Sequence, residues 1–502
     1  MCNGTCVTDD HPRRRLLQLA GAGLLTGLAG CGAPLPFGSE TPGDETATPE
    51  APPTDATATT AQTPTDTLTP TGTATATDTA TSTRTRTPAT ATPDTATSTR
   101  TRTPSSTPTP TPTATAAPSG RSASASFGAD EGAADGAFGR SLTVSPDGSR
   151  ALVGAPDDGA GAVHVFERTN VNWTQRTRIT LSDGTSGDRF GAAVTLSPEG
   201  DRAIVGAPGR NDGAGAAYVL QRQGGVWAES ATLTPEEQTG GLGAAVALEP
   251  QSETVLVGAP GRAGDSASSA GSAHVFVYAG GWRQRGSLAA TDGTAGDRFG
   301  ESAALIDAET AVLGAPGADA GAVSVFRRTD TEWEERETVP APDGTASAGF
   351  GADVAVSPER SAMYVGAPAE DTDGGAGAGA VHVYVRDARM WNLERTLTAA
   401  GADADDALGE TVASTTDGRT VLAGAPGEQN RAGDGAGAAY QFRRADGRWR
   451  QQAKLLADVD ASDRFGAGLA LTPGADTALL GAPGDEDPNG DGAGAAYVFR
   501  SP

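Results

Sequence analysis

The sequence has very little cysteine and almost no lysine. Its 502 residues include three cysteines, Cys2, Cys6 and Cys31, and none lies beyond residue 31. The long remainder of the chain therefore contains no disulfide, no thiol nucleophile and no thiolate metal site. Lys454 is the single lysine, so nearly all of the positive charge in the chain belongs to arginine.

Basic charge is scarce against a large acidic excess. The chain has 63 Asp and Glu residues against 37 Lys and Arg residues, and its formal net charge is −26. No segment forms the basic patch that phosphate groups require, which excludes nucleic acid as a partner. An acidic, lysine-poor composition is typical of halophilic proteins, because concentrated salt shortens the Debye length to about 3 Å at 1 M and screens self-repulsion. A GC-rich coding bias is the alternative explanation.

Catalytic signatures are also missing. The sequence contains no Gly-x-Ser-x-Gly, His-Glu-x-x-His, P-loop or Cys-x-x-Cys pattern. His164, His274 and His382 occupy equivalent positions of a repeat in which other copies have Tyr or Ser, which indicates a structural role. We expect no enzyme. The alternative is a polysaccharide hydrolase or lyase that uses paired carboxylates, but such a site would break the repeat pattern, and we find no such set of residues.

The longest apolar run lies near the N-terminus. Arg13–Arg15 precede the run 16–28, which is too short to span a bilayer and is typical of a signal peptide. The twin arginine resembles the Tat export signal, and the sequence ending in Cys31 resembles a lipobox. These resemblances predict a signal peptide over 1–30, lipid attachment at Cys31 and a location on the extracellular face of the cytoplasmic membrane. An uncleaved N-terminal anchor is the alternative.

The segment 31–120 consists mostly of Thr, Pro, Ala, Ser and Asp. Such a composition has too little apolar surface to offset the entropy of folding. Ser/Thr-rich sequence with proline is typical of a mucin-like stalk that carries O-glycans. We expect a disordered stalk, glycosylated or not, that holds the folded part away from the membrane.

The remainder of the chain, residues 121–502, is a sevenfold repeat. Gly-Ala-Pro occurs seven times, and a Phe-Gly or Leu-Gly pair precedes each copy at a period of 51 to 58 residues. The repeats begin at Phe138, Phe190, Leu242, Phe299, Phe350, Leu408 and Phe465. A period of this length indicates a solenoid or a propeller.

Each repeat reads as four short strands. In the second repeat, runs near 192–196, 202–206, 216–220 and 227–233 are β-type, and turn residues separate them. Every tryptophan in the chain occupies the start of the fourth run, which indicates packing between repeats. The sequence predicts an all-β fold, a seven-bladed β-propeller of four-stranded antiparallel blades.

Ring closure is predicted from the two ends of the repeat region. The last repeat stops after its third strand, and the alternating run 122–127 ends at Phe127, eleven positions before Phe138. This is the usual spacing between the fourth strand of one repeat and the next Phe-Gly. We expect residues 122–127 to form the outer strand of the last blade and to remove an open sheet edge.

The recurring Phe-Gly and Gly-Ala-Pro motifs resemble the FG-GAP repeat family, the blade type of the integrin α-subunit propeller. The resemblance covers about 125–502 and is greatest to microbial cell-surface members. It implies a seven-bladed propeller and, often, adhesion or ligand binding at the cell surface. Members commonly bind Ca²⁺ in the turn between the first two strands, but here turns such as 145–148 are too short to supply six to eight oxygens.

Two candidate sites remain in the folded region. The last repeat carries Asp485, Asp487, Asn489 and Asp491 after its Gly-Ala-Pro, and three of these match the start of an EF-hand loop without its closing Glu. This segment is either a weak Ca²⁺ site or a solvated acidic loop, and no other cofactor is indicated. Asn172 begins an Asn-Trp-Thr sequon and is a candidate for N-glycosylation.

Together these features predict a lipid-anchored extracellular propeller that binds a protein or glycan partner at the cell surface. The membrane is contacted through the N-terminal lipid. The alternatives are a secreted polysaccharide-active enzyme on the same scaffold and a structural component of the cell envelope.

Overall fold

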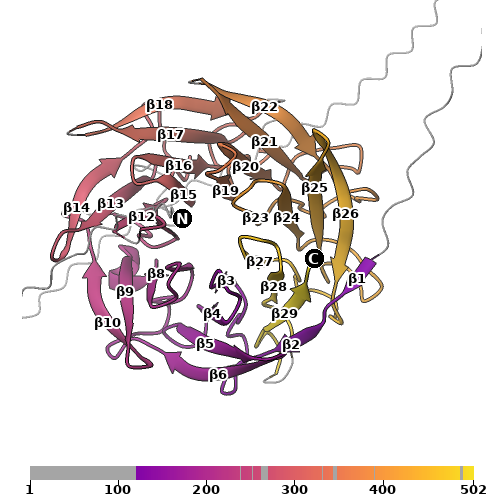
Figure 1. The fold of residues 1–502 in the computed structure, drawn as a ribbon, viewed down its shortest axis with the longest axis horizontal. Coiled ribbons are helices and arrows are strands. Elements are labelled where there is room, and N and C mark those ends of the chain that lie inside the picture. Colours follow the sequence, from indigo (N-terminus) through magenta and orange to yellow (C-terminus); the bar gives the residue numbers. More distant parts are fainter. Residues whose placement is uncertain are drawn as a thin grey trace, which may run out of the picture. The chain divides into compact units, whose positions relative to one another are not determined.

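The structure, a computed structural model, describes residues 120–502 apart from residues 238, 252, 262–269, 331, 343–346, 389 and 487–489. These residues form seven β-sheets arranged around a central axis (Figure 1). The predicted fold class, a seven-bladed β-propeller with four-stranded antiparallel blades, is confirmed. The expected signal peptide, Cys31 and the expected stalk up to residue 119 lie outside the described residues.

The strands follow the repeats along the chain, four to a blade, from the inner to the outer edge. Blade 1 contains β3 (Ser141–Val144), β4 (Arg150–Ala155), β5 (Ala162–Thr169) and β6 (Asn172–Ile179). Blade 2 contains β7 (Val194–Leu196), β8 (Arg202–Ala207), the short helix α1 (Arg210–Gly213), β9 (Ala216–Gln223) and β10 (Val226–Leu233). Blade 3 contains β11 (Ala245–Leu248), β12 (Thr254–Ala259), β13 (Ser272–Tyr278) and β14 (Trp282–Leu288).

Blades 4 to 6 repeat this order. Blade 4 contains β15 (Ser302–Asp307), β16 (Thr310–Ala315), β17 (Ala322–Arg328) and β18 (Trp333–Pro340). Blade 5 contains β19 (Val354–Ser357), β20 (Ala362–Ala367), β21 (Ala380–Asp387) and β22 (Met390–Leu397). Blade 6 contains β23 (Val412–Ser414), β24 (Thr420–Ala425), β25 (Ala438–Ala445) and β26 (Arg448–Leu456).

Blade 7 is built from both ends of the repeat region. β27 (Gly468–Leu471), β28 (Thr477–Ala482) and β29 (Ala495–Arg500) supply three strands, and β2 (Ala125–Phe127) pairs antiparallel with β29 as the fourth. The run 122–127, expected as one strand, is divided. Its first residue belongs to β1 (Gly120–Ser122), which pairs parallel with β26 of blade 6. The segment 120–127 therefore crosses from blade 6 to blade 7.

The Phe-Gly and Gly-Ala-Pro motifs recur together because their glycines meet between blades. A β-carbon built on Gly154 of blade 1 would lie 2.0 Å from the carbonyl oxygen of Gly191, the Phe-Gly glycine of blade 2. The same approach occurs at all seven junctions, including the one between Gly481 of blade 7 and Gly139 of blade 1. Glycine is required at these positions because no side chain fits between the two backbones.

Aromatic side chains fill the space between neighbouring blades. Phe190, with no exposed surface, packs against Leu152 and Val163 of blade 1 and Val205 of blade 2. Farther from the axis, Trp227 packs at the edge of the same cluster. The other five tryptophans join the equivalent clusters, so the packing role expected for this repeated position is what the structure describes.

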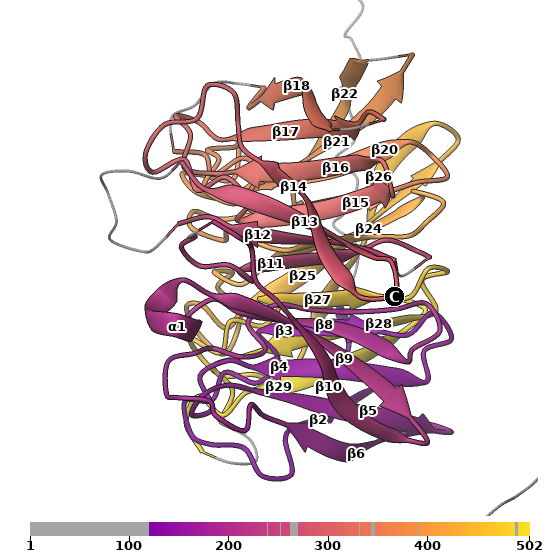
Figure 2. The ribbon, with the colours of Figure 1, turned by 90° about the vertical axis from the view of Figure 1, so that its left-hand side faces the viewer.

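The ring has two different faces. The connections from strand four to the next blade and from strand two to strand three emerge on one side, which we call the loop face. Figure 2 shows it on the left, where α1 protrudes. The opposite side, the turn face, carries the short turns between strands one and two and the hairpins between strands three and four. Among the described residues, no helix has the length and apolar character needed to cross a bilayer.

Candidate functional site: the mouth of the central channel

The residue that follows each Phe-Gly or Leu-Gly pair lies beside the central channel. In four blades this residue is alanine, at Ala192, Ala244, Ala352 and Ala467. In blades 1, 4 and 6 it is charged: Arg140, Glu301 and Glu410. These three residues break the sevenfold pattern at one level of the ring. They were not predicted from the sequence, although the identity of this one repeat position distinguishes them.

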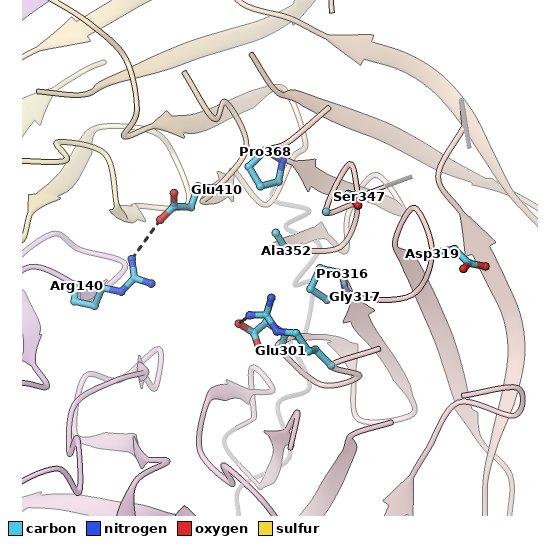
Figure 3. Close-up of a pocket in the computed structure, with 11 residues that line it drawn as sticks. Arg140, Glu301, Pro316, Gly317, Asp319, Ser347, Ala352, Pro368 and Glu410 are labelled. Carbon is cyan, nitrogen blue, oxygen red and sulfur yellow. Dashed lines mark hydrogen bonds and ion pairs between the residues drawn. The ribbon is translucent and has the colours of Figure 1, made fainter. Parts of the chain in front are cut away.

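The charged residues lie at a cavity on the loop face, at the entrance of the channel. The cavity has a volume of about 460 Å³ and is lined by Arg140, Arg298, Glu301, Pro316, Gly317, Asp319, Ser347, Gly349, Ala352, Pro368 and Glu410 (Figure 3). Below it, the inner strands of all seven blades line a narrower space of about 290 Å³. We call the larger cavity the mouth.

Ion pairs across the blades position the charged side chains of the mouth. Arg140 Nη1 of blade 1 reaches to within 3.4 Å of Glu410 Oε1 of blade 6 (Figure 3). Arg464 Nη2 of blade 7 contacts the same oxygen at 2.6 Å. Glu301 of blade 4 is paired with Arg298 of the preceding loop.

Two of these arginines occupy a strained backbone position. The residue before each Phe-Gly or Leu-Gly pair has a positive φ in all seven blades, and at Arg298 and Arg464 the value is 58°. Blades 3 and 5 have glycine here, which adopts this conformation without cost. For a non-glycine residue it costs about 1 kcal/mol. Arg298 and Arg464 thus place long charged side chains at the mouth from a backbone conformation that is unfavourable for arginine.

The mouth is close to electrically neutral. The ionisable side chains that line it are two arginines and three carboxylates, namely Arg140, Arg298, Glu301, Asp319 and Glu410. Arg464 lies outside this lining and adds a positive charge through its ion pair with Glu410. The whole chain carries a net charge of −26. The mouth therefore departs from the acidic character of the protein as well as from its repeat pattern.

A carboxyl group with a raised pKa lies in the channel wall. Asp353 follows Ala352 and accepts hydrogen bonds from the backbone N–H groups of Val412 at 2.7 Å and Val354 at 2.9 Å. Burial raises the pKa of Asp353 to about 7, against the lowering effect of these two bonds. Blades 1, 4 and 6 have hydroxyl residues here, and Ser141, Ser302 and Thr411 donate instead to a glycine carbonyl of the next blade.

The four predicted calcium ligands are only partly covered by the structure. Asp487 and Asn489 lie outside the described residues, and Asp491 is exposed. The Asp485 side chain is buried and accepts a hydrogen bond of 2.5 Å from the Tyr497 hydroxyl. The described residues contain no group of three or more His, Cys, Asp or Glu side chains arranged to hold a metal ion. The calcium site remains a hypothesis.

Asp485 belongs to an acidic pocket on the loop face of blade 7. The pocket has a volume of about 170 Å³ and is lined by Asp458, Val459, Asp460, Asp463, Asp485 and Glu486. Burial, with the charges of Asp485 and other acidic neighbours, raises the pKa of Asp463 to about 6. Burial and Asp485 also raise the pKa of the Tyr497 phenol.

Equivalent positions in two other blades carry a cation. In blade 6, Lys454 forms an ion pair with the buried Glu428, and in blade 1 Arg178 contacts Asp158 at 2.8 Å. Lys454 and Arg178 lie on the fourth strand, opposite the central residue of the third strand. The residue in this register in blade 7 is Ser126.

The remaining candidate residues have structural surroundings. His164, His274 and His382 are buried on the third strands of separate blades, and His382 Nε2 lies 2.6 Å from Glu370 Oε2 of its own blade. Asn172 is exposed at the start of β6, on a turn-face hairpin.

Comparison with known families decides the identity of the repeats. The FG-GAP repeat profile matches residues 173–220, 282–326, 333–384, 391–442 and 449–499. The chain belongs to the FG-GAP repeat family. Each match begins at a tryptophan of one blade and ends in the third strand of the next, so the family's unit of sequence is offset by one strand from the blade.

Solved structures share the FG-GAP chain's architecture at low sequence identity. Hydrazine synthase of Kuenenia stuttgartiensis has a TM-score of 0.51 and 13% identity, covering 74% of this chain and 97% of that chain. The RRP9 WD40 repeats have a TM-score of 0.50 and 11% identity, covering 75% and 97%. These likenesses concern the fold alone. No curated protein sequence matches the chain.

Proposed function

We propose that this FG-GAP propeller is a lipid-anchored module at the cell surface that binds a protein or glycan partner through the mouth on its loop face. The FG-GAP scaffold fits an interaction module. One observation carries the choice of site. Charged residues replace alanine at three of seven equivalent positions, and these three residues lie at the same cavity.

Residues that every blade shares serve the stability of the ring. Every blade uses the same glycines, a buried Phe or Leu before the first strand and the same buried strands, so these positions maintain the ring. A side chain present in a few blades is not required by the ring. Arg140, Glu301 and Glu410 are of this kind, and they lie in a concave site of the size that ligands occupy.

The surface location rests on the N-terminal sequence. The arginines before the run 16–28 and the sequence ending in Cys31 support export and lipid attachment. In cells, the Cys31→Ser protein should be released into the medium, whereas the parent protein should stay with the membrane fraction. Retention of the variant on the membrane after residues 1–30 have been removed would contradict the proposed anchor.

Binding can be tested with the released Cys31→Ser protein after removal of residues 1–30, because residues 31–502 of this variant contain no cysteine. Labelled protein should bind saturably to cells that lack the gene, at native salt. Ser347→Cys in the mouth, coupled to a maleimide polyethylene glycol, should abolish this binding. The same group on Glu309→Cys, in a turn of the opposite face, should not.

The alternatives give different results in this experiment. Turnover of a polysaccharide without saturable binding would favour an enzyme. Loss of envelope integrity on gene deletion, with no binding of the soluble protein, would favour a structural component. Binding blocked equally by both coupled groups would contradict the assignment to the loop face.

A further inference from the structure

Hydrogen-bond donors and acceptors both line the mouth. The guanidinium groups of Arg140 and Arg298 provide donors, and the carboxylates of Glu301 and Glu410 and the Ser347 hydroxyl provide acceptors. The Pro368 ring and the Ala352 methyl group supply a small apolar surface beside them. A volume of about 460 Å³ has room for one or two sugar rings.

Arg140, Glu301 and Glu410 already have ion-pair partners within the protein. Glu410 is shared by Arg140 and Arg464, and Glu301 is paired with Arg298. A charged ligand would have to separate one of these pairs or leave a charge without a partner, and both cost free energy. A neutral polyhydroxyl ligand can accept from the guanidinium groups and donate to the carboxylates while the pairs remain.

In the part of the chain that the structure describes, the loop face lacks the exposed large hydrophobic side chains that anchor protein partners. Among the described residues, the exposed large hydrophobic side chains are Val171, Val226, Tyr278, Met390 and Leu393. All of them belong to the third and fourth strands or to the hairpins between those strands. Residues 262–269, 343–346 and 487–489, which the structure does not describe, contain no large hydrophobic residue in the sequence. Protein interfaces usually depend on buried aromatic or aliphatic anchors at their centre.

From this combination we infer that the mouth is a binding site for a neutral glycan, held by Arg140, Glu301 and Glu410. The inference rests on the proposed function and names its ligand class. A sugar ring would place its hydroxyl groups against the ion-paired side chains and its C–H face against Pro368 and Ala352. Because the contacts are hydrogen bonds to a neutral ligand, we expect the affinity to change little with salt concentration.

The probes are neutral di- and trisaccharides of glucose, galactose, mannose and N-acetylglucosamine, and the readouts are saturation-transfer NMR and calorimetry on the Cys31→Ser protein. At least one probe should bind saturably. The Glu301→Gln, Glu410→Gln double variant should weaken that binding at least about tenfold, since hydrogen bonds to charged groups are stronger than neutral ones. Glu309→Gln, the same substitution on the turn face of blade 4, should leave it unchanged.

A second variant leaves the ion pairs intact. Ala352→Gln places a side chain of the length of Glu301 in the mouth, at a repeat position where blades 4 and 6 already carry glutamate. It should fold normally and weaken sugar binding at least about tenfold. Ala192→Gln, at the same repeat position of blade 2 but outside the lining of the mouth, is its matched control.

The outcomes separate the two proposals. If no neutral sugar binds, but deglycosylated envelope protein or chondroitin sulfate binds and Ala352→Gln abolishes it, the proposed function stands and the glycan class is wrong. If a neutral sugar binds and neither mouth variant weakens it, the inferred site is wrong. If nothing binds to the loop face, both proposals fail.

Discussion

The α-carbon of Gly481 in blade 7 faces the carbonyl oxygen of Gly139 in blade 1, and a β-carbon on Gly481 would lie 1.9 Å from that oxygen. This contact joins the last repeat to the first and has the same geometry as the six other junctions. The same glycine contact therefore closes the ring and joins the other pairs of neighbouring blades.

Substitution of this glycine should destabilise the ring. Gly481→Ala forces two backbones apart, and we expect a loss of at least about 3 kcal/mol in the free energy of unfolding, measured by denaturant titration. Gly281→Ala is the control, because a β-carbon there meets no atom within 4 Å. Equal stability of the two variants would show that the junction can relax.

Removal of the segment 120–127 should also lower stability. Phe127 packs against Phe166 with ring centroids 4.5 Å apart, and Arg121 donates to the carbonyl oxygen of Ser501 at 2.7 Å. Without this segment blade 7 keeps three strands and exposes the edge of β29. The melting temperature should fall clearly, whereas deletion of the equally long segment 111–118 should leave it unchanged.

A lysine at position 126 should stabilise the protein at low salt. Ser126→Lys places an ammonium group beside the acidic pocket of blade 7, in the register that Lys454 occupies in blade 6. We expect a gain of about 1 kcal/mol at low ionic strength, and the gain should shrink as salt screens the new pair. Ser126→Met, of similar length and no charge, should show no salt-dependent gain.

Asp353 should make stability fall as pH rises. Its folded-state pKa of about 7 exceeds the usual value of 3.8, so the folded protein binds this proton more tightly than the unfolded chain. The stabilisation is complete below pH 4 and is lost as pH rises to about 7. Relative to the parent, Asp353→Asn should become more stable by about 1–3 kcal/mol between pH 4 and 8. The exposed Asp387→Asn should show no such trend in denaturant titrations at each pH.

The fold was predictable because each repeat carries the same packing residues at the same spacing. Glycines that meet between blades, together with an aromatic residue at constant spacing, are compatible with one arrangement of four strands in each repeat. Pairing of β1 with β26 was not predictable, because this strand has three residues and no counterpart in other repeats. Nor was the mouth predicted, since Arg140, Glu301 and Glu410 lie far apart in sequence and line one cavity only when blades 1, 4 and 6 surround one axis.

The origin of the fourth strand of blade 7 constrains the order of events in biosynthesis. β2 emerges from the ribosome before any complete blade, yet its partner β29 is made after all the other strands. The last blade therefore cannot be completed until β29 has been made, and β2 stays an unpaired strand until then. A transport route that accepts proteins after they have folded, as the twin arginine suggests, would allow this late step to occur before export.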